Sequence, residues 1–304
     1  MTIGYSSPLY ILPFDHRSSF ERGLFGWKGP LTKEQTEKIA QSKAVIYDAF
    51  RLSLTKGNSK EESGILVDPQ FGAALLRDAR ANGFIACMPA EKSGQAEFQF
   101  EYGDDYEAEI EKFQPNFVKA LVRYNPEDDE VLNKRQAGRL KDLSETAHRL
   151  GRYFMFELLV PPTKEQNERV RGNQEVYDTK LRPALMAAAI MELQNRGVEP
   201  DVWKIEGLDH RDDCVEVVKA AQREGRKDVS CIVLGRGSNE EKVIDWLTVG
   251  AKVPGFIGFA VGRTSFWEPL VALRDGKIKR EKAVEEIAGR FMKWTQVFAD
   301  AKRA

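Results

Sequence analysis

The stretch Asp201-Val202-Trp203-Lys204-Ile205-Glu206-Gly207 has the composition of a short β-strand with a lysine in its middle. Branched and aromatic residues fill it, and a proline and a glycine bound it, which is typical of strands. Side chains alternate between the two faces of a strand, so Val202, Lys204 and Glu206 share one face. A mid-strand lysine has poor access to water. It either forms a structural ion pair with Glu206 or a neighbour, or it acts as an amine nucleophile toward a ketone.

Seven further runs have strand-like patterns, and helical patterns lie between them. The eight predicted strands are Leu9–Phe14, Gly64–Asp68, Phe84–Pro89, Phe117–Tyr124, Tyr153–Val160, Val202–Glu206, Val229–Leu234 and Gly255–Val261. The predicted helices are Thr32–Leu54, Gly72–Ala81, Tyr106–Lys112, Glu127–Leu150, Leu181–Arg196, Arg211–Glu224, Glu240–Val249 and Arg280–Ala301. Such alternation is typical of parallel βαβ units. Eight units in 304 residues predict the α/β class, with a single (β/α)8 TIM barrel spanning residues 1–304. An open doubly wound sheet is disfavoured, because no Gly-x-Gly-x-x-Gly turn follows the first three strands.

Composition excludes several functional classes. The chain is 42% hydrophobic and 31% charged, with a formal net charge of −1, so it can bury a core. It lacks a basic run for nucleic acid and an apolar run of the ~20 residues that a membrane span requires. Three widely spaced cysteines argue against disulfides, and no signal peptide begins the chain, so we expect a cytoplasmic protein. No residue set has the spacing of metal ligands or a cofactor motif, so we expect neither.

Two more charged residues share the parity of the strand lysine. Lys119 lies in the fourth predicted strand and Glu157 in the fifth. If the apolar faces contact the helices, Lys119, Glu157 and Lys204 all point into the barrel from adjacent strands, which lie ~4.8 Å apart. Two ammonium groups around one carboxylate would lower a lysine pKa and provide a proton shuttle. A buried structural ion-pair cluster is the open alternative.

Other polar residues lie at predicted strand ends. Asp15 and Asp68 end the first and second strands, and we expect both at the barrel mouth, where they could orient hydroxyls or relay protons. Capping of the following segment is an equal alternative for Asp68. His16 is expected to contact substrate. Two long connections, Glu91–Asp105 and Pro161–Lys180, follow strands three and five on the face where active sites of barrels are built.

Glycine–arginine pairs follow the last two predicted strands. Gly235-Arg236-Gly237 comes after strand seven and Gly262-Arg263 after strand eight. The loops after these two strands often bind phosphate in such barrels. Glycine lets backbone N–H groups approach an anion, and arginine adds charge-assisted hydrogen bonds. The two segments therefore predict a phosphate site, with ordinary tight turns as the alternative.

Several segments together resemble a known family. They are Leu9-Tyr10-Ile11-Leu12-Pro13-Phe14-Asp15-His16-Arg17, Glu91-Lys92-Ser93-Gly94, Val118-Lys119, Trp203-Lys204-Ile205-Glu206 and Gly258-Phe259-Ala260-Val261-Gly262-Arg263-Thr264. They are similar to class I aldolase-like barrels related to tagatose-1,6-bisphosphate aldolase. Within these, the resemblance is to the bacterial family linked to myo-inositol catabolism and often fused to a 5-dehydro-2-deoxygluconokinase domain. It covers nearly the whole chain, although these 304 residues contain no sugar-kinase half.

The resemblance implies a cofactor-independent aldolase that cleaves 2-deoxy-5-keto-gluconate 6-phosphate to dihydroxyacetone phosphate and malonic semialdehyde. The resemblance implies that Lys204 forms the Schiff base and that Lys119 and Glu157 assist. We expect the base to be Glu157 or a group assisted by Asp15. The residues that we expect to bind substrate are His16, Arg17, Asp68, Glu91, Lys92, Arg123, Gly235, Arg236, Gly237, Gly262 and Arg263. Either Arg17 or Arg123 would hold the carboxylate of this phosphorylated keto-sugar acid.

Two alternatives to this interpretation stay open. One is a class I aldolase for another ketose phosphate, such as tagatose bisphosphate or a sulfosugar phosphate. The other is a non-catalytic sugar-phosphate-binding partner of the sugar kinase. A homo-oligomer and a kinase partner from the same pathway are both compatible with the sequence.

Overall fold

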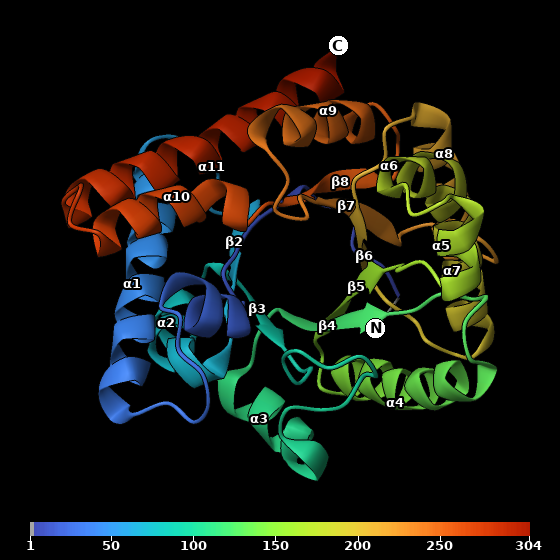
Figure 1. Ribbon diagram of the computed structural model, residues 1–304, viewed down its shortest axis with the longest axis horizontal. Coiled ribbons are helices and arrows are strands. Elements are labelled where there is room, and N and C mark those ends of the chain that lie inside the picture. The colour runs from blue at the N-terminus through green and yellow to red at the C-terminus, as the bar shows by residue number, and fades with distance from the viewer. Residues whose placement is uncertain (1–2) are drawn as a thin grey trace.

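The computed structural model describes residues 3–304 and contains a closed barrel of eight parallel strands (Figure 1). The strands are β1 (Leu9–Pro13), β2 (Ser63–Leu66), β3 (Ile85–Pro89), β4 (Phe117–Arg123), β5 (Tyr153–Leu159), β6 (Val202–Glu206), β7 (Ser230–Leu234) and β8 (Phe256–Ala260). Each strand pairs with the next along the chain, and β8 pairs with β1. The predicted (β/α)8 TIM barrel is confirmed.

Helices surround the barrel (Figure 1). The α-helices are α1 (Lys33–Thr55), α2 (Pro69–Ala81), α3 (Tyr106–Phe113), α4 (Glu130–Arg149), α5 (Lys164–Arg169), α6 (Gln174–Val176), α7 (Arg182–Asn195), α8 (Arg211–Gln222), α9 (Glu240–Ala251), α10 (Arg263–Arg274) and α11 (Arg280–Arg303). Shorter turns are η1 (Ser19–Leu24), η2 (Gly103–Asp105) and η3 (Tyr177–Leu181). The C-terminal helix α11 packs on α1, α9 and α10, which closes the helical ring. No helix within residues 3–304 is long and apolar enough to cross a membrane.

The predicted helices differ from the observed ones after β8. We predicted no helix between Val261 and Arg280, yet α10 begins directly after that strand. Pro269 lies inside α10 and interrupts its helical pattern in the sequence, because proline usually ends or kinks a helix. This helix matters for the site, since its N-terminus lies at the mouth of the barrel.

Apolar side chains fill the lower barrel and support a charged layer above them. Phe117, Met155 and Val202 belong to a buried cluster inside the barrel, and Tyr5 packs edge-on against Phe117 with ring centroids 5.0 Å apart. The charged side chains lie two residues further along each strand, and they are Lys119 in β4, Glu157 in β5 and Lys204 in β6. The strand register places Glu157 directly beside Lys204, so their side chains share one layer.

Asp68 does not line the pocket at the barrel mouth, which corrects one of our two expectations for it. Its carboxylate is fully buried, caps α2 by accepting a hydrogen bond from the backbone N–H of Phe71 at 2.9 Å, and pairs with the fully buried Lys43 of α1. The Lys43 ammonium also lies 5.1 Å from the ring centroid of Phe20. Asp68 is therefore a structural cap and counter-ion, and it does not line the pocket described below.

This assignment predicts a stability effect for Asp68→Asn. Asparagine retains an oxygen that can cap α2 but removes the charge that Lys43 requires, and breaking a buried ion pair costs about 3–5 kcal/mol. The matched control is Asp129→Asn, because Asp129 caps α4 at an exposed position by accepting from Val131 and Leu132. That change should alter the free energy of unfolding by less than about 0.5 kcal/mol. Equal losses in urea unfolding would contradict a role for the buried charge.

Candidate active site

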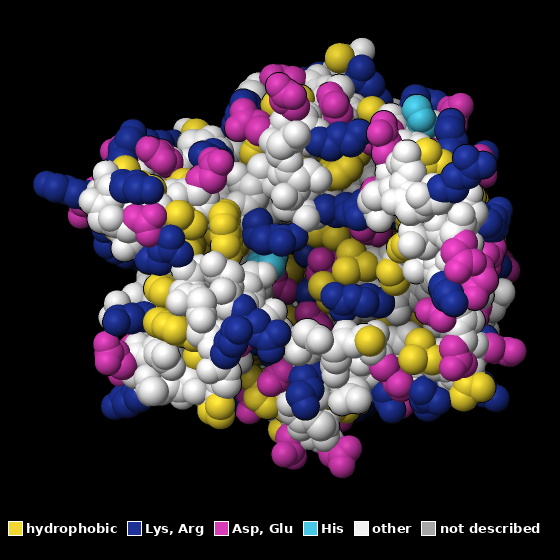
Figure 2. All heavy atoms as spheres, viewed as in Figure 1, with side chains coloured by type: hydrophobic (Ala, Val, Ile, Leu, Met, Phe, Trp, Pro, Cys, Tyr) yellow, Lys and Arg dark blue, Asp and Glu magenta, His cyan; other side chains and the backbone are white. Residues whose placement is uncertain are grey.

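A pocket of about 380 Å³ opens at the C-terminal ends of the strands. Figure 2 shows this hollow above the centre of the barrel, with lysine and arginine side chains around it and acidic side chains in its depth. All but one of the sequence-predicted site residues line it. They are Asp15, His16, Arg17, Glu91, Lys92, Lys119, Arg123, Glu157, Lys204, Gly235, Arg236, Gly237, Gly262 and Arg263. The exception is Asp68.

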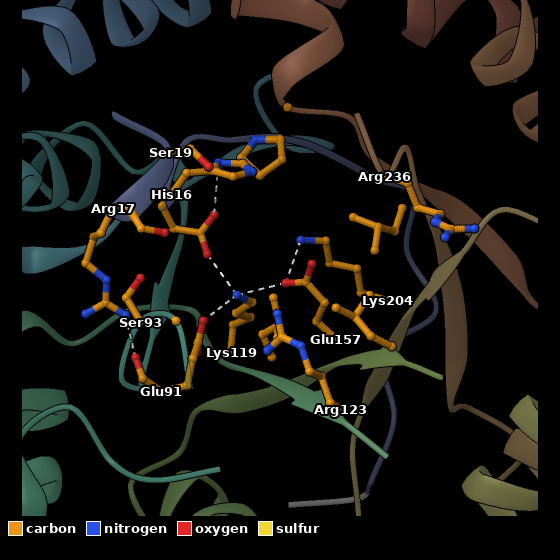
Figure 3. Close-up of a pocket in the computed structure, with 18 of the residues that line it drawn as sticks. His16, Arg17, Ser19, Glu91, Ser93, Lys119, Arg123, Glu157, Lys204 and Arg236 are labelled. Atoms are coloured by element: carbon orange, nitrogen blue, oxygen red, sulfur yellow. Dashed lines mark hydrogen bonds and ion pairs between the residues drawn. The ribbon is translucent and has the colours of Figure 1, made fainter. Parts of the chain in front are cut away.

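Five charged side chains meet at the base of the pocket (Figure 3), and we call Asp15, Glu91, Lys119, Glu157 and Lys204 the lysine–carboxylate cluster. The ammonium nitrogen of Lys119 lies 2.8 Å from Asp15 Oδ2, 2.6 Å from Glu91 Oε1 and 2.8 Å from Glu157 Oε2. The Lys204 ammonium lies 2.9 Å from the same Glu157 oxygen. Both lysines are at least 98% buried, at 1% and 2% exposure.

The two lysines have different surroundings. Three carboxylates enclose Lys119, whereas Glu157 is the one carboxylate within 4 Å of Lys204 among residues 3–304. Burial alone would lower the pKa of Lys119, but Asp15, Glu157 and Glu91 together raise it well above its ordinary value. A lowered pKa was predicted for a lysine of this cluster. The prediction did not say which lysine, and the pKa of Lys119 moves in the opposite direction because the carboxylates outnumber the cations around it.

The carboxylates of the cluster differ in protonation as well. Burial raises the pKa of Glu157, but Lys119 and Lys204 outweigh it and bring that pKa below its ordinary value. The same opposition lowers the pKa of Asp15, with Lys119 as its main cationic neighbour. For Glu91, burial prevails and raises its pKa. Glu157 and Asp15 are therefore carboxylates at neutral pH and can accept protons.

His16 lies beside the cluster as a neutral base. Burial lowers the pKa of His16 to about 4, although the nearby Asp15 carboxylate partly opposes this. Its Nδ1 is 3.9 Å from Asp15 Oδ1, and its ring contacts Phe266 edge-on at 5.8 Å between centroids. The imidazole is thus uncharged at neutral pH and can exchange hydrogen bonds with a hydroxyl group.

The loops after β7 and β8 form a basic end of the pocket. Arg236 is held between two carboxylates, with Nε 2.9 Å from Glu206 and NH1 2.9 Å from Asp178. Arg263 is exposed, and it donates a hydrogen bond of 2.7 Å to the backbone carbonyl of Arg236. It is also the first residue of α10, whose N-terminus carries a partial positive charge. Arg263 is thus the less neutralised of the two arginines.

Position 262 requires glycine because the turn after β8 passes close to the loop after β1. A Cβ atom there would lie 2.5 Å from the carbonyl oxygen of Pro13 and 3.1 Å from the His16 ring. Any side chain would therefore push the turn after β8 away from the loop after β1. The glycine keeps the first N–H groups of α10 close to the pocket.

Comparison with known proteins identifies the family. Residues 4–302 match the model of the family described as "Uncharacterized protein conserved in bacteria (DUF2090)". The chain belongs to the DUF2090 family. A search of curated proteins found no match to the sequence.

Solved structures share the fold of this DUF2090 protein at low sequence identity. Cgl0159 from Corynebacterium glutamicum is 15% identical, with a TM-score of 0.58 over 96% of this chain and 88% of that one. An archaeal fructose 1,6-bisphosphate aldolase is 15% identical, with a TM-score of 0.57 over 93% and 94%. The fructose-bisphosphate aldolase from Slackia heliotrinireducens is 11% identical, with a TM-score of 0.55 over 93% and 86%. These likenesses establish the barrel fold alone.

The structure adds site residues that the sequence analysis passed over. Glu206 also lines the pocket, and its parity with Lys204 was the available signal. It does not pair with Lys204 but with Arg236, while Asp178 holds the same arginine from η3. No sequence signal marked Asp178, because its contact depends on how the segment after β5 folds. The remaining additions are Pro13, Ser18, Ser19, Ser93, Gly94, Gln95, Ala96, Phe98, Leu121, Leu159, Leu234 and Ala260.

Within the described part of the chain, from residue 3 onward, no group of three or more His, Cys, Asp or Glu side chains is arranged to hold a metal ion. The carboxylates at the base of the pocket instead surround the ammonium group of Lys119.

Proposed function

We propose that this DUF2090 protein is a class I aldolase that cleaves a phosphorylated keto-sugar acid through a Schiff base on Lys204. The observation that carries the proposal is the unequal pairing of the two buried lysines. Lys119 is held as a cation by three carboxylates, while Lys204 faces the single carboxylate of Glu157. A nucleophilic amine must lose its proton, and Lys204 breaks one ion pair in doing so, whereas Lys119 would break three.

Glu157 is placed to move the protons of imine formation. Its Oε2 lies 2.9 Å from the Lys204 nitrogen, so it can accept the proton that the ammonium group must lose. The neutral amine then attacks the ketone carbon, and the proton returns to the carbinolamine oxygen, which leaves as water. The product is an iminium ion on Lys204, which withdraws electrons from the adjacent carbon–carbon bond. Lys119 stays charged and keeps the Glu157 carboxylate oriented.

Cleavage needs a base for the hydroxyl group on the far carbon of the bond that breaks, two carbons from the iminium carbon. Glu157 or Asp15 accepts that proton, since both are carboxylates at neutral pH. The hydroxyl oxygen becomes an aldehyde, and the electrons of the broken bond form an enamine on Lys204. The enamine carbon then takes up a proton, and water hydrolyses the iminium ion to release the ketone product. Protons and water balance over the cycle.

The substrate that we propose is 2-deoxy-5-keto-gluconate 6-phosphate, cleaved between C3 and C4 into malonic semialdehyde and dihydroxyacetone phosphate. The resemblance to the aldolase family of myo-inositol catabolism supports this choice. The basic end at β7 and β8 supports a phosphate, held by Arg263 and the N–H groups beside Gly235, Gly237 and Gly262. Two relatives of the same fold carry the name fructose-bisphosphate aldolase, which also favours this class of reaction. A cytoplasmic enzyme acting after a sugar kinase fits the same proposal.

Borohydride trapping tests the proposed chemistry. The protein is incubated with dihydroxyacetone phosphate, reduced and digested, and the modified peptide is identified by mass spectrometry. We expect a stable adduct on Lys204. An adduct on Lys119 would exchange the roles of the two lysines. No adduct, with dihydroxyacetone phosphate bound, would exclude imine chemistry and favour a sugar-phosphate-binding protein without lyase activity.

A further inference from the structure

We infer that Arg123 binds the carboxylate of the substrate, so that the pocket selects keto-sugars that carry an anion at each end. The inference rests on the proposed function and deepens it by naming a specificity residue. It decides between Arg17 and Arg123, which the sequence left open. The decision comes from the surroundings of the two guanidinium groups.

Two of the three guanidinium nitrogens of Arg17 are occupied by contacts within the protein, and the third, Nε, is buried. Its side chain is 5% exposed. Its NH1 donates to Glu101 Oε2 at 2.7 Å, and its NH2 donates to the backbone carbonyl of Glu91. Arg17 therefore fastens the loop after β1 to the loop after β3. Turning this guanidinium toward a ligand would leave the carboxylate of Glu101 unpaired.

Arg123 is held in place but keeps donors free. It is exposed, lines the pocket and ends β4, on the strand face that Lys119 also occupies. Its NH1 donates to the backbone carbonyl of Gln95 at 2.9 Å, which fixes the direction of the side chain. Within residues 3–304 its guanidinium group makes no other hydrogen bond or ion pair, so Nε and NH2 remain available. A guanidinium edge of this kind matches a carboxylate in a bidentate pair.

The position of Arg123 relative to Lys204 fits a substrate with two anions. In the closed barrel β5 and β6 separate β4 from the basic end at β7 and β8. In Figure 3 Lys204 lies between Arg123 and Arg236. A ketone that reacts with Lys204 while its phosphate occupies the β7–β8 end must extend its other end toward β4. That end carries the aldehyde fragment, so Arg123 would hold the part of the substrate that leaves.

The surroundings of Arg123 favour a carboxylate over a second phosphate. Behind it the chain continues as Tyr124-Asn125-Pro126. The Tyr124 backbone N–H donates to Leu159 at 2.9 Å, the Asn125 side-chain amide donates to Pro161 at 2.8 Å, and proline has no N–H group. The β4 end thus lacks the backbone cradle of the β7–β8 end. Leu121 and Leu159 line the pocket on either side of this position, and Leu159 is the register partner of Arg123. Apolar walls beside one guanidinium suit a methylene carboxylate such as malonic semialdehyde.

Aldol condensation with matched aldehydes tests the inference. Dihydroxyacetone phosphate is combined with malonic semialdehyde, with propanal, which has a methyl group in place of the carboxylate, or with glyceraldehyde 3-phosphate. For Arg123→Met we expect kcat/KM for malonic semialdehyde to fall about 100-fold, the loss expected for a charge-assisted pair, while that for propanal changes less than about twofold. The control is Arg135→Met, since Arg135 is exposed on α4 and pairs with Glu97 outside the pocket. It should leave all three values unchanged.

Each other outcome has a defined meaning. Equal losses for malonic semialdehyde and propanal would give Arg123 a structural role and overturn the inference. A larger loss of kcat/KM for glyceraldehyde 3-phosphate would mean that Arg123 binds a second phosphate and not a carboxylate. No change in any kcat/KM would mean that another residue binds the carboxylate. Borohydride trapping with dihydroxyacetone phosphate is run on the wild type and on Arg123→Met, and we expect adducts in both. Failure of the wild type to trap would overturn the proposed function instead.

Discussion

Replacing Lys204 with alanine should abolish the adduct trapped by borohydride and reduce cleavage on the order of 10⁵-fold, as expected when a covalent nucleophile is removed. The reason is that no other amine in the cluster can substitute for it. Lys119 is the neighbouring amine, but Asp15, Glu91 and Glu157 keep it protonated. Turnover is measured by the release of dihydroxyacetone phosphate, and the adduct by mass spectrometry.

A variant of the proton shuttle separates the nucleophile from its helpers. Glu157→Gln should lower turnover by about 10²–10⁴-fold, the usual contribution of a general acid–base group, and should still yield an adduct on Lys204. The fold of Lys204→Ala should persist, because Glu157 keeps its ion pair with Lys119. If Lys204→Ala retained near-wild-type turnover, or if the adduct appeared on Lys119, Lys204 would not be the nucleophile.

The alternation of side chains along strands explains why much of this site was predictable. Lys119, Glu157 and Lys204 have the same parity in three successive strands, and closure of the barrel brings such residues together. Sequence pattern does not reveal which partners a charge acquires. Glu91 reaches Lys119 from a long loop, and Glu206 turns to Arg236 although Lys204 is closer in sequence. These contacts depend on loop conformation, which has no comparable periodicity.

Two differences between prediction and structure involve prolines. The barrel mouth and a cap were equal expectations for Asp68, and the N-cap that the structure shows agrees with Pro69, since proline is favoured at the first position of a helix. Lys43, whose charge pairs with Asp68, lies in α1, and no local sequence pattern links the two residues. The helix α10 was missed because Pro269 interrupts its pattern. Its first turn nevertheless supplies Arg263 to the pocket.

Lys119→Met should lower the free energy of unfolding by about 3–5 kcal/mol at pH 7.5, because three buried carboxylates lose the cation that they share. Methionine keeps a similar length, so the loss of packing is small. The matched control is Lys38→Met, where an exposed lysine of α1 pairs with Glu34 one turn away. That change should cost less than about 0.5 kcal/mol. Both variants are measured by urea unfolding.

The pH dependence of the free energy of unfolding shows whether the charge of Lys119 causes the loss of stability in Lys119→Met. In the wild type Lys119 lowers the pKa of Asp15 and Glu157, so these carboxylates stabilise the fold above their unfolded pKa values of about 4. That contribution disappears as the pH falls through the lowered values. In Lys119→Met the unpaired carboxylates take up protons at higher pH, which relieves their repulsion.

The difference in stability between wild type and Lys119→Met should therefore be largest near pH 7.5 and should shrink as the pH falls toward 4.5. The raised pKa of Lys119 itself does not alter this trend. A lysine with a raised pKa contributes its full stabilisation below the unfolded value of about 10.4, and loses it only at more alkaline pH. A difference that stayed constant from pH 7.5 to 4.5 would mean that Lys119 stabilises the barrel by packing and not by its charge. In that case the carboxylates would not depend on it for their ionisation, and the cationic role that we assign to Lys119 would be lost.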